Sequence, residues 1–137
     1  MNYLAAEAAL AERLQQLTTL RKVYLSTNMD ALNERNQAAP CAHVLYAGDQ
    51  LPNNAQGGQL SKVKQTWLVV VAVRLGPDSQ QTGQLIDQVL KKIMGHKADG
   101  FSPFVRCNTN AKPRVNAGFA YYPLAFTTTF THQGEQA

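Results

Sequence analysis

The most hydrophobic stretch of the chain covers residues 65–75, a run rich in β-branched side chains that contains neither Pro nor Gly. A continuous apolar run of this length and composition is typical of a strand buried on both faces, so we expect it to be central in its sheet. Just before it, Lys62 and Lys64 alternate with Val63 and Gln65. Because successive side chains of a strand point to opposite faces, this alternation predicts a basic face where the strand begins.

Two segments have the periodicity of amphipathic helices. Residues 3–20 place apolar side chains on one helical face, namely Tyr3, Ala6, Leu10, Leu14 and Leu17. Residues 80–94 form a second such face from Leu85, Ile86, Val89, Leu90, Ile93 and Met94. In this second helix Asp87 and Lys91 have the spacing and order of a favourable ion pair, and Gly95 suits the position after the helix end.

Weaker patterns predict the remaining strands. Residues 21–27 form a short strand, residues 42–47 a second strand after Pro40, and residues 101–108 a weak strand. Residues 118–131 are rich in aromatic side chains and Thr, and they predict a long closing strand. Pro123 interrupts this strand and predicts a bulge or an edge position there.

Polar segments lie between these elements. Residues 28–35 can form one or two helical turns, with Asn28 as the N-cap. Residues 49–58 have no periodicity and predict a long loop at the tip of a hairpin that leads into the central strand. Residues 108–116 predict a polar loop that carries Lys112 and Arg114.

The predicted fold is therefore a single α+β domain over residues 1–137, with an ordered core at about 3–131 and a tail at 132–137. Two amphipathic helices pack on a mostly antiparallel sheet of four or five strands. The side chains expected to fill the core are Trp67, Val69, Val71, Leu85, Val89, Ile93, Tyr122 and Phe126.

Composition narrows the class of protein. The chain has 45% apolar and only 16% charged residues, which favours a protein that hides surface in an assembly. A formal charge of +4 is a weak bias toward anionic partners and falls short of a nucleic-acid signature. Cys41 and Cys107 are far apart and predict two reduced thiols. With no secretory signal and no apolar run of transmembrane length, we expect a soluble intracellular domain with no membrane contact.

Candidate chemistry is sparse. Cys41 and His43 would share a strand face and are the best available nucleophile–base pair, although small structural residues entering a strand explain them more simply. The three histidines and two cysteines lack metal-ligand spacing, and no phosphate-binding glycine motif is present. We therefore expect no enzyme activity, no metal and no cofactor.

The ordered features resemble the tail terminator proteins of long-tailed bacteriophages, including those of Mu-like phages. The resemblance spans roughly residues 4–130, and it is carried by Pro40 and the strings that follow it. These strings are His43-Val44-Leu45-Tyr46, Gln65-Thr66-Trp67-Leu68-Val69 with Arg74 beyond it, the helix with Leu85, Ile86, Val89 and Leu90, and Gly118-Phe119-Ala120-Tyr121-Tyr122-Pro123-Leu124.

The resemblance implies a non-enzymatic virion protein at the head-proximal end of the tail, present in the host cytoplasm during assembly. Members of this family form a hexameric ring that caps the finished tail tube and stops its polymerisation. The ring also offers a surface for head joining and leaves a lumen for DNA. The implied partners are copies of this chain, the tail tube protein, head–tail connector proteins and DNA bound without sequence specificity.

The basic residues are the candidate contacts at the ring faces or lumen. They are Lys62, Lys64, Arg74, Lys112 and Arg114. Two other classes of protein remain open from the sequence. One is another phage morphogenesis protein, such as a head–tail connector or a minor tail protein. The other is a small basic nucleic-acid-binding module, whose binding would weaken steeply with salt.

Overall fold

The computed structural model describes residues 2–25, 37–51, 58–76 and 79–135, and all structural statements below concern these residues. They form a helix, three strands, a second helix and three more strands. The bounds are α1 Ala6–Gln15, β1 Lys22–Leu25, β2 Cys41–Gln50, β3 Leu60–Arg74, α2 Ser79–Ile93, β4 Val105–Cys107, β5 Arg114–Asn116 and β6 Phe119–Gln133.

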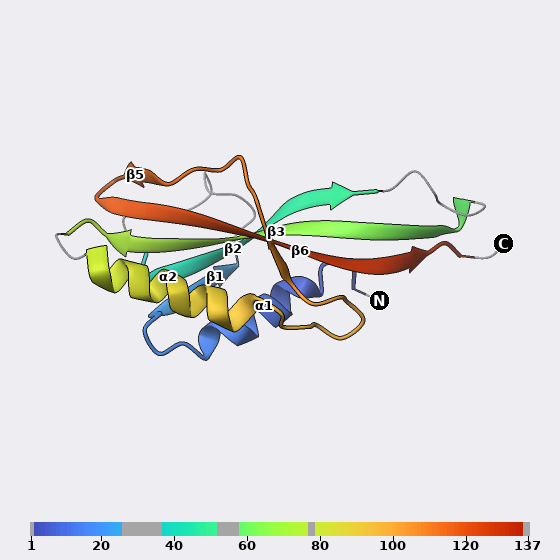
Figure 1. Ribbon diagram of the computed structural model, residues 1–137, viewed down its shortest axis with the longest axis horizontal. Coiled ribbons are helices and arrows are strands. Elements are labelled where there is room, and N and C mark those ends of the chain that lie inside the picture. The colour runs from blue at the N-terminus through green and yellow to red at the C-terminus, as the bar shows by residue number, and fades with distance from the viewer. Residues whose placement is uncertain (1, 26–36, 52–57, 77–78, 136–137) are drawn as a thin grey trace.

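The strands form one six-stranded sheet in the order β1-β2-β3-β6-β4, with β5 also paired to β6. β1 runs parallel to β2, and every other pair is antiparallel. β3 and β6 pair along their whole length, from Leu60 opposite Gln133 to Arg74 opposite Phe119. We call this pair the β3–β6 ribbon, and it crosses the molecule from end to end (Figure 1). The predicted α+β fold with a mostly antiparallel sheet is confirmed, with six strands instead of four or five.

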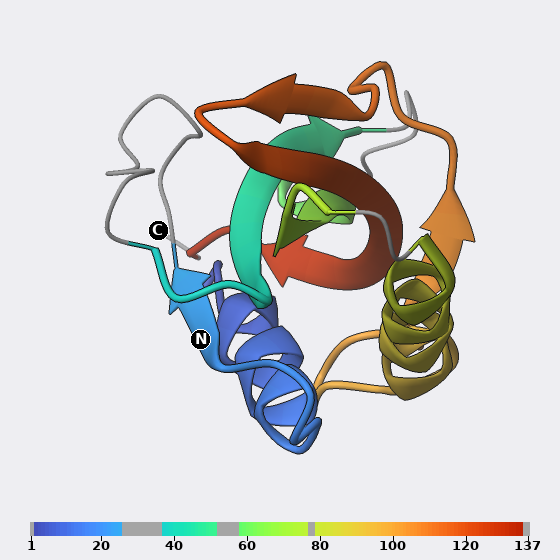
Figure 2. The ribbon, with the colours of Figure 1, turned by 90° about the vertical axis from the view of Figure 1, so that its left-hand side faces the viewer.

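Both helices lie on the same face of the sheet (Figures 1 and 2). The face of β3 beneath them carries Trp67, Val69 and Val71, which join one large apolar cluster. The helices fill this cluster with Ala6, Leu10, Leu14, Leu85, Val89 and Ile93. Of the eight side chains expected in the core, Tyr122 is partly buried against the cluster, and the other seven are buried. Burying each large apolar side chain contributes roughly 1.5–3 kcal/mol, so this cluster is the main source of stability.

A second apolar cluster closes the opposite face at one end of the ribbon. It consists of Ala39, Cys41, Leu45, Val70, Ala72, Phe119 and Tyr121. Since Val69 and Val71 face the helices while Val70 and Ala72 face this cluster, this part of β3 is buried on both faces. The prediction of a central, doubly buried strand is confirmed here. Toward the other end of β3, Lys62 and Lys64 are exposed while Val63 and Gln65 are buried, as the alternation predicts.

The helix predictions are confirmed with two corrections. α2 begins and ends within one residue of the predicted bounds, Asp87 and Lys91 pair at 2.9 Å, and Gly95 has a φ of +82°. Met94, however, is 51% exposed, because it follows the helix end and leaves the apolar face. α1 stops at Gln15 instead of residue 20, since two adjacent threonines at 18–19 favour helix poorly.

Three of the predicted boundaries in the strands and loops are wrong. β2 extends through Asp49 and Gln50, because a bulge at Tyr46 and Gly48, where Gly48 has a φ of +111°, lets the pairing with β3 continue. The predicted loop at 108–116 contains β5, which a tight turn with positive φ at its two residues, 117–118, folds onto β6. β4 spans only three residues of the predicted strand at 101–108.

Pro123 causes no bulge, because β3 and β6 stay in register across Val70 opposite Pro123. Of the two predicted alternatives, the bulge is wrong and the edge-like position is confirmed. On the other side of β6, β4 pairs with residues 125–127 and β5 with residues 119–121, so Pro123 lies where the described residues provide no strand partner. A proline is tolerated there because no ladder hydrogen bond is required of its nitrogen. The helical turns predicted at 28–35, and residues 52–57 of the loop predicted at 49–58, lie outside the described residues.

Candidate functional site

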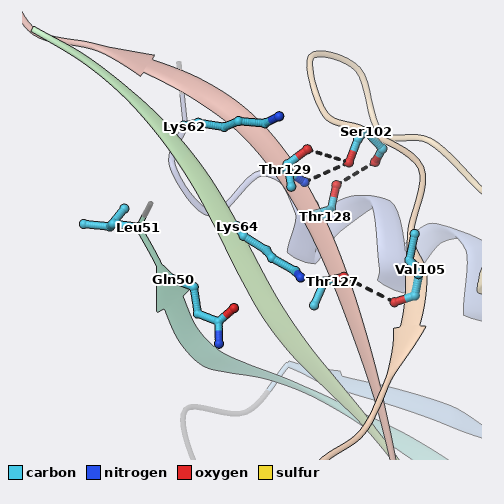
Figure 3. A pocket seen from close by; sticks show the side chains of 9 residues that line it. All are labelled: Gln50, Leu51, Lys62, Lys64, Ser102, Val105, Thr127, Thr128 and Thr129. Carbon is cyan, nitrogen blue, oxygen red and sulfur yellow. Dashed lines mark hydrogen bonds between the residues drawn. The ribbon is translucent and has the colours of Figure 1, made fainter. Parts of the chain in front are cut away.

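A groove of about 770 Å³ lies near one end of the β3–β6 ribbon (Figure 3). We call it the Lys62–Lys64 groove; it is lined by Gln50, Leu51, Lys62, Lys64, Ser102, Val105, Thr127, Thr128 and Thr129. Lys64 stands between Gln50 of β2 and Thr129 of β6 in the sheet register. Because Val63 belongs to the cluster beneath the helices, Lys62 and Lys64 face away from them. The groove thus lies on the sheet face that the helices do not cover.

The wall of the groove is fixed by Ser102 and the three threonines of β6. The Thr128 hydroxyl donates to the Ser102 carbonyl oxygen at 2.6 Å, and the Ser102 hydroxyl oxygen accepts from the backbone N–H of Thr129 at 2.9 Å. The backbone N–H of Ser102 donates in turn to the carbonyl oxygen of Thr129 at 2.9 Å. These bonds hold the segment before β4 against β6 and give the groove a rigid side.

The other candidate cations lie at the opposite end of the ribbon. The Arg74 guanidinium is 5.1 Å from the centre of the Phe119 ring, and that of Arg114 is 5.1 Å from the centre of the Tyr121 ring. Such stacking holds an arginine side chain against an aromatic face. Lys112 is exposed just before β5. Ten residues of β3 separate Lys64 from Arg74, which at strand spacing is about 33 Å. The five basic residues therefore form two groups instead of one surface.

Cys41 and His43 meet in a buried polar cluster. Their Sγ and Nε2 atoms are 3.7 Å apart, and Nε2 also lies 3.0 Å from Oε1 of Gln37, whose amide donates to the Tyr121 hydroxyl at 2.6 Å. Burial raises the pKa of the Cys41 thiol to about 11 and lowers the pKa of His43 to about 4. The thiol and the imidazole are thus both neutral near pH 7 and closed off from solvent, so this pair lacks the thiolate that nucleophilic catalysis needs.

A second polar cluster joins the segment before α1 to β2. The hydroxyl groups of Tyr3 and Tyr46 both donate to the carboxylate of Asp49. The hydrogen bond to Asp49 raises the pKa of Tyr3 to about 12, and burial and the same carboxylate raise the pKa of Tyr46. The sequence places Asp49 in a loop, so this contact is visible only in the structure.

Neither of the other two histidines marks a site. His96 follows α2, and His132 makes edge-to-face ring contacts with Tyr3 and Phe130. The described residues contain no group of three or more His, Cys, Asp or Glu side chains that could hold a metal ion. No helix among them is long and apolar enough to cross a membrane.

Apart from Lys62 and Lys64, the groove residues were not singled out as site residues from the sequence; they are Gln50, Leu51, Ser102, Val105, Thr127, Thr128 and Thr129. Polar and β-branched residues of this kind are typical of any half-exposed strand and carry no signal of a site. Only the pairing of β2, β3, β6 and β4 brings them next to the two lysines.

Comparisons with known proteins give a family and a fold. A family model described as "Phage tail terminator protein" matches residues 1–136. Among solved structures, a chain of the "Virion of native gene transfer agent (GTA) particle" is similar with a TM-score of 0.62 at 12% sequence identity. The alignment covers 97% of this chain and 100% of that chain. At 12% identity, this similarity shows only that the two chains share a fold. A search of curated proteins finds no match.

Proposed function

Because the chain belongs to the phage tail terminator family and is thus a structural protein of the phage tail, we propose that it caps the finished tail tube as a ring. The ring, a hexamer, stops tube polymerisation, presents the surface for head joining and leaves a lumen through which DNA passes. The observation that carries this proposal is the family match over residues 1–136.

The distribution of basic residues supports a ring through which DNA passes without being bound tightly. A module built to bind nucleic acid concentrates its lysines and arginines on one face. Here Lys62 and Lys64 are separated from Arg74, Lys112 and Arg114 by most of the β3–β6 ribbon. The neutral Cys41–His43 pair likewise supports a role without catalysis. In the ring, Arg74, Lys112 and Arg114 would lie in the lumen or on one face of the ring.

The first experiment measures assembly and tail length. Size-exclusion chromatography with light scattering should give a species six times the mass of the 15.0 kDa chain, formed alone or on addition of tail tubes. Loss of the gene should give tails of uncontrolled length. Normal-length tails that lack heads would instead indicate a head–tail connector, and a strictly monomeric protein in the presence of tubes would contradict the ring.

The second experiment tests the lumen contacts. Replacing Lys112 and Arg114 with Glu should leave folding intact, because both residues are exposed and the stacking of Arg114 on Tyr121 contributes only about 0.5–1 kcal/mol at such a site. The change should impair DNA ejection or head joining in assembled virions. The matched control is Arg21→Glu with Lys22→Glu, which changes the net charge equally at exposed positions by β1. Virions that eject DNA and join heads normally would remove Lys112 and Arg114 from the lumen.

A further inference from the structure

We propose that the Lys62–Lys64 groove docks a short, extended acidic segment of a partner protein, with an apolar side chain at each end of that segment. The proposal requires only the groove, and it holds whether or not the chain forms a ring. It assigns to this face of the sheet a peptide-binding role distinct from any contact with DNA.

The charge of the groove selects an anion. Of its nine lining residues two are lysines and none is Asp or Glu. Lys62 and Lys64 extend from β3 toward the threonines of β6 (Figure 3). Among the described residues neither ammonium group has a hydrogen-bond or ion-pair partner, so both are available to carboxylates. The hydroxyl groups of Thr127 and Thr129 donate within the protein, to the Val105 carbonyl oxygen at 3.5 Å and to the Ser102 hydroxyl oxygen at 2.9 Å. The two lysines are therefore the donors that the groove offers to a carboxylate.

The exposed apolar side chains at the two sides of the groove favour a peptide ligand over a phosphodiester backbone. Leu51 lies at one side and Val105 at the other, with 62% and 60% of their surface exposed. Exposed apolar side chains at both ends of a charged floor would gain from covering by apolar side chains, and a DNA backbone supplies none. The two lysines also make too small a cationic surface to follow a duplex.

The width of the sheet sets the length of the ligand. The lining residues come from β2, β3, β6 and β4, which are neighbours in the sheet, and from Leu51 and Ser102 just outside β2 and β4. Three strand spacings amount to about 14 Å, and an extended chain covers this distance with about four residues. The preferred segment is therefore an apolar residue, two acidic residues and a second apolar residue.

The test is an NMR titration of the full-length protein with the capped peptide Leu-Glu-Glu-Leu. The backbone amides of Lys64, Val105 and Thr129 should shift together, and the same peptide with Gln in place of both Glu should bind several-fold more weakly. The Lys62→Glu/Lys64→Glu variant should weaken binding of the acidic peptide by at least about fivefold, the size expected for two exposed ion pairs. The control variant Arg21→Glu/Lys22→Glu, with the same change in charge at exposed positions by β1, should bind as the parent does.

Four outcomes would overturn the proposal. Equal binding of the acidic and neutral peptides would show that charge does not select the ligand. Loss of binding in the control variant would show that the net charge of the protein, and not the two lysines of the groove, determines binding. A DNA duplex that shifts the same amides while the peptide shifts none would make the groove a nucleic-acid contact. The same shifts on raising the protein concentration alone, again with no response to the peptide, would assign the groove to a second copy of this chain.

Discussion

The two ends of the β3–β6 ribbon share one register but have opposite surroundings. At the closed end, residues 67–74 and 119–126, the helices cover one face and the second apolar cluster covers the other. At the open end, residues 60–66 and 127–133, the helix side is packed while the other face carries Lys62 and Lys64. In Figure 2 the strands curl strongly about the view axis, with both helices on the same side.

This comparison separates stability from recognition. A strand buried on both faces offers no face of its own to a partner, so at the closed end β3 mainly holds the fold together, and the exposed cations Arg74 and Arg114 lie at its margin. The open end of the same strands pairs equally well but leaves one face to the solvent, and there the groove forms. The polar clusters follow this division, with Cys41 and His43 enclosed at the closed end and the Tyr3–Asp49 contact near the surface of the open end.

The largest effect should come from a charge at the closed end. Val70 is 3% exposed in the second cluster, and Val70→Asp would bury a carboxylate without a partner. That cost of several kcal/mol is comparable with the whole stability of a small domain, so we expect no cooperative unfolding transition by circular dichroism. The control is Lys64→Asp, which introduces the same carboxylate at an exposed position of the open end and should fold. A soluble, ring-forming Val70→Asp protein would contradict double burial of this strand.

A smaller effect should appear at the closed end in acid. Burial in the folded state lowers the pKa of His43 from 6.5 to about 4. Between pH 6.5 and pH 4 the unfolded chain therefore takes up a proton at His43 that the folded chain does not. The free energy of unfolding should therefore fall as the pH drops from 6.5 to 4. Urea unfolding of His43→Gln, which cannot take up this proton, should show a smaller fall over that range. Equal falls in the two proteins would mean that His43 is not responsible.

The smallest effect should appear at the open end in alkali. The folded state raises the pKa of Tyr3 from 10.0 to about 12, so its contribution is complete below pH 10 and is lost as the pH rises toward 12. Tyr3→Phe removes one hydrogen bond to Asp49 and should lower the stability at pH 8 by about 0.5–1.5 kcal/mol. Its urea midpoint should then change less between pH 10 and 12 than that of the parent. An unchanged alkaline profile would assign the loss to other tyrosines.

The sequence predicted the local elements well. The apolar periodicity of α2 gave its bounds, its ion pair and its terminal glycine, because these depend on residues within a few positions of one another. The family resemblance carried by the aromatic strings is confirmed by the match over residues 1–136. The extension of β2 through Asp49 and the existence of β5 were missed, because the pairing partner, and not the local composition, makes those residues strands.

By itself, the sequence determined which segments are helices, which strand is central and which face of that strand is basic. Each of these follows from periodicities of two or of about 3.6 residues within one element. Only the tertiary structure decided that Lys64 lies beside Thr129 and not beside Arg74, because the β3–β6 register brings distant residues together and keeps residues of one strand apart. The same register separates the basic residues into two regions, with Lys62 and Lys64 at the open end and Arg74 at the closed end. The groove therefore forms at the open end of the ribbon.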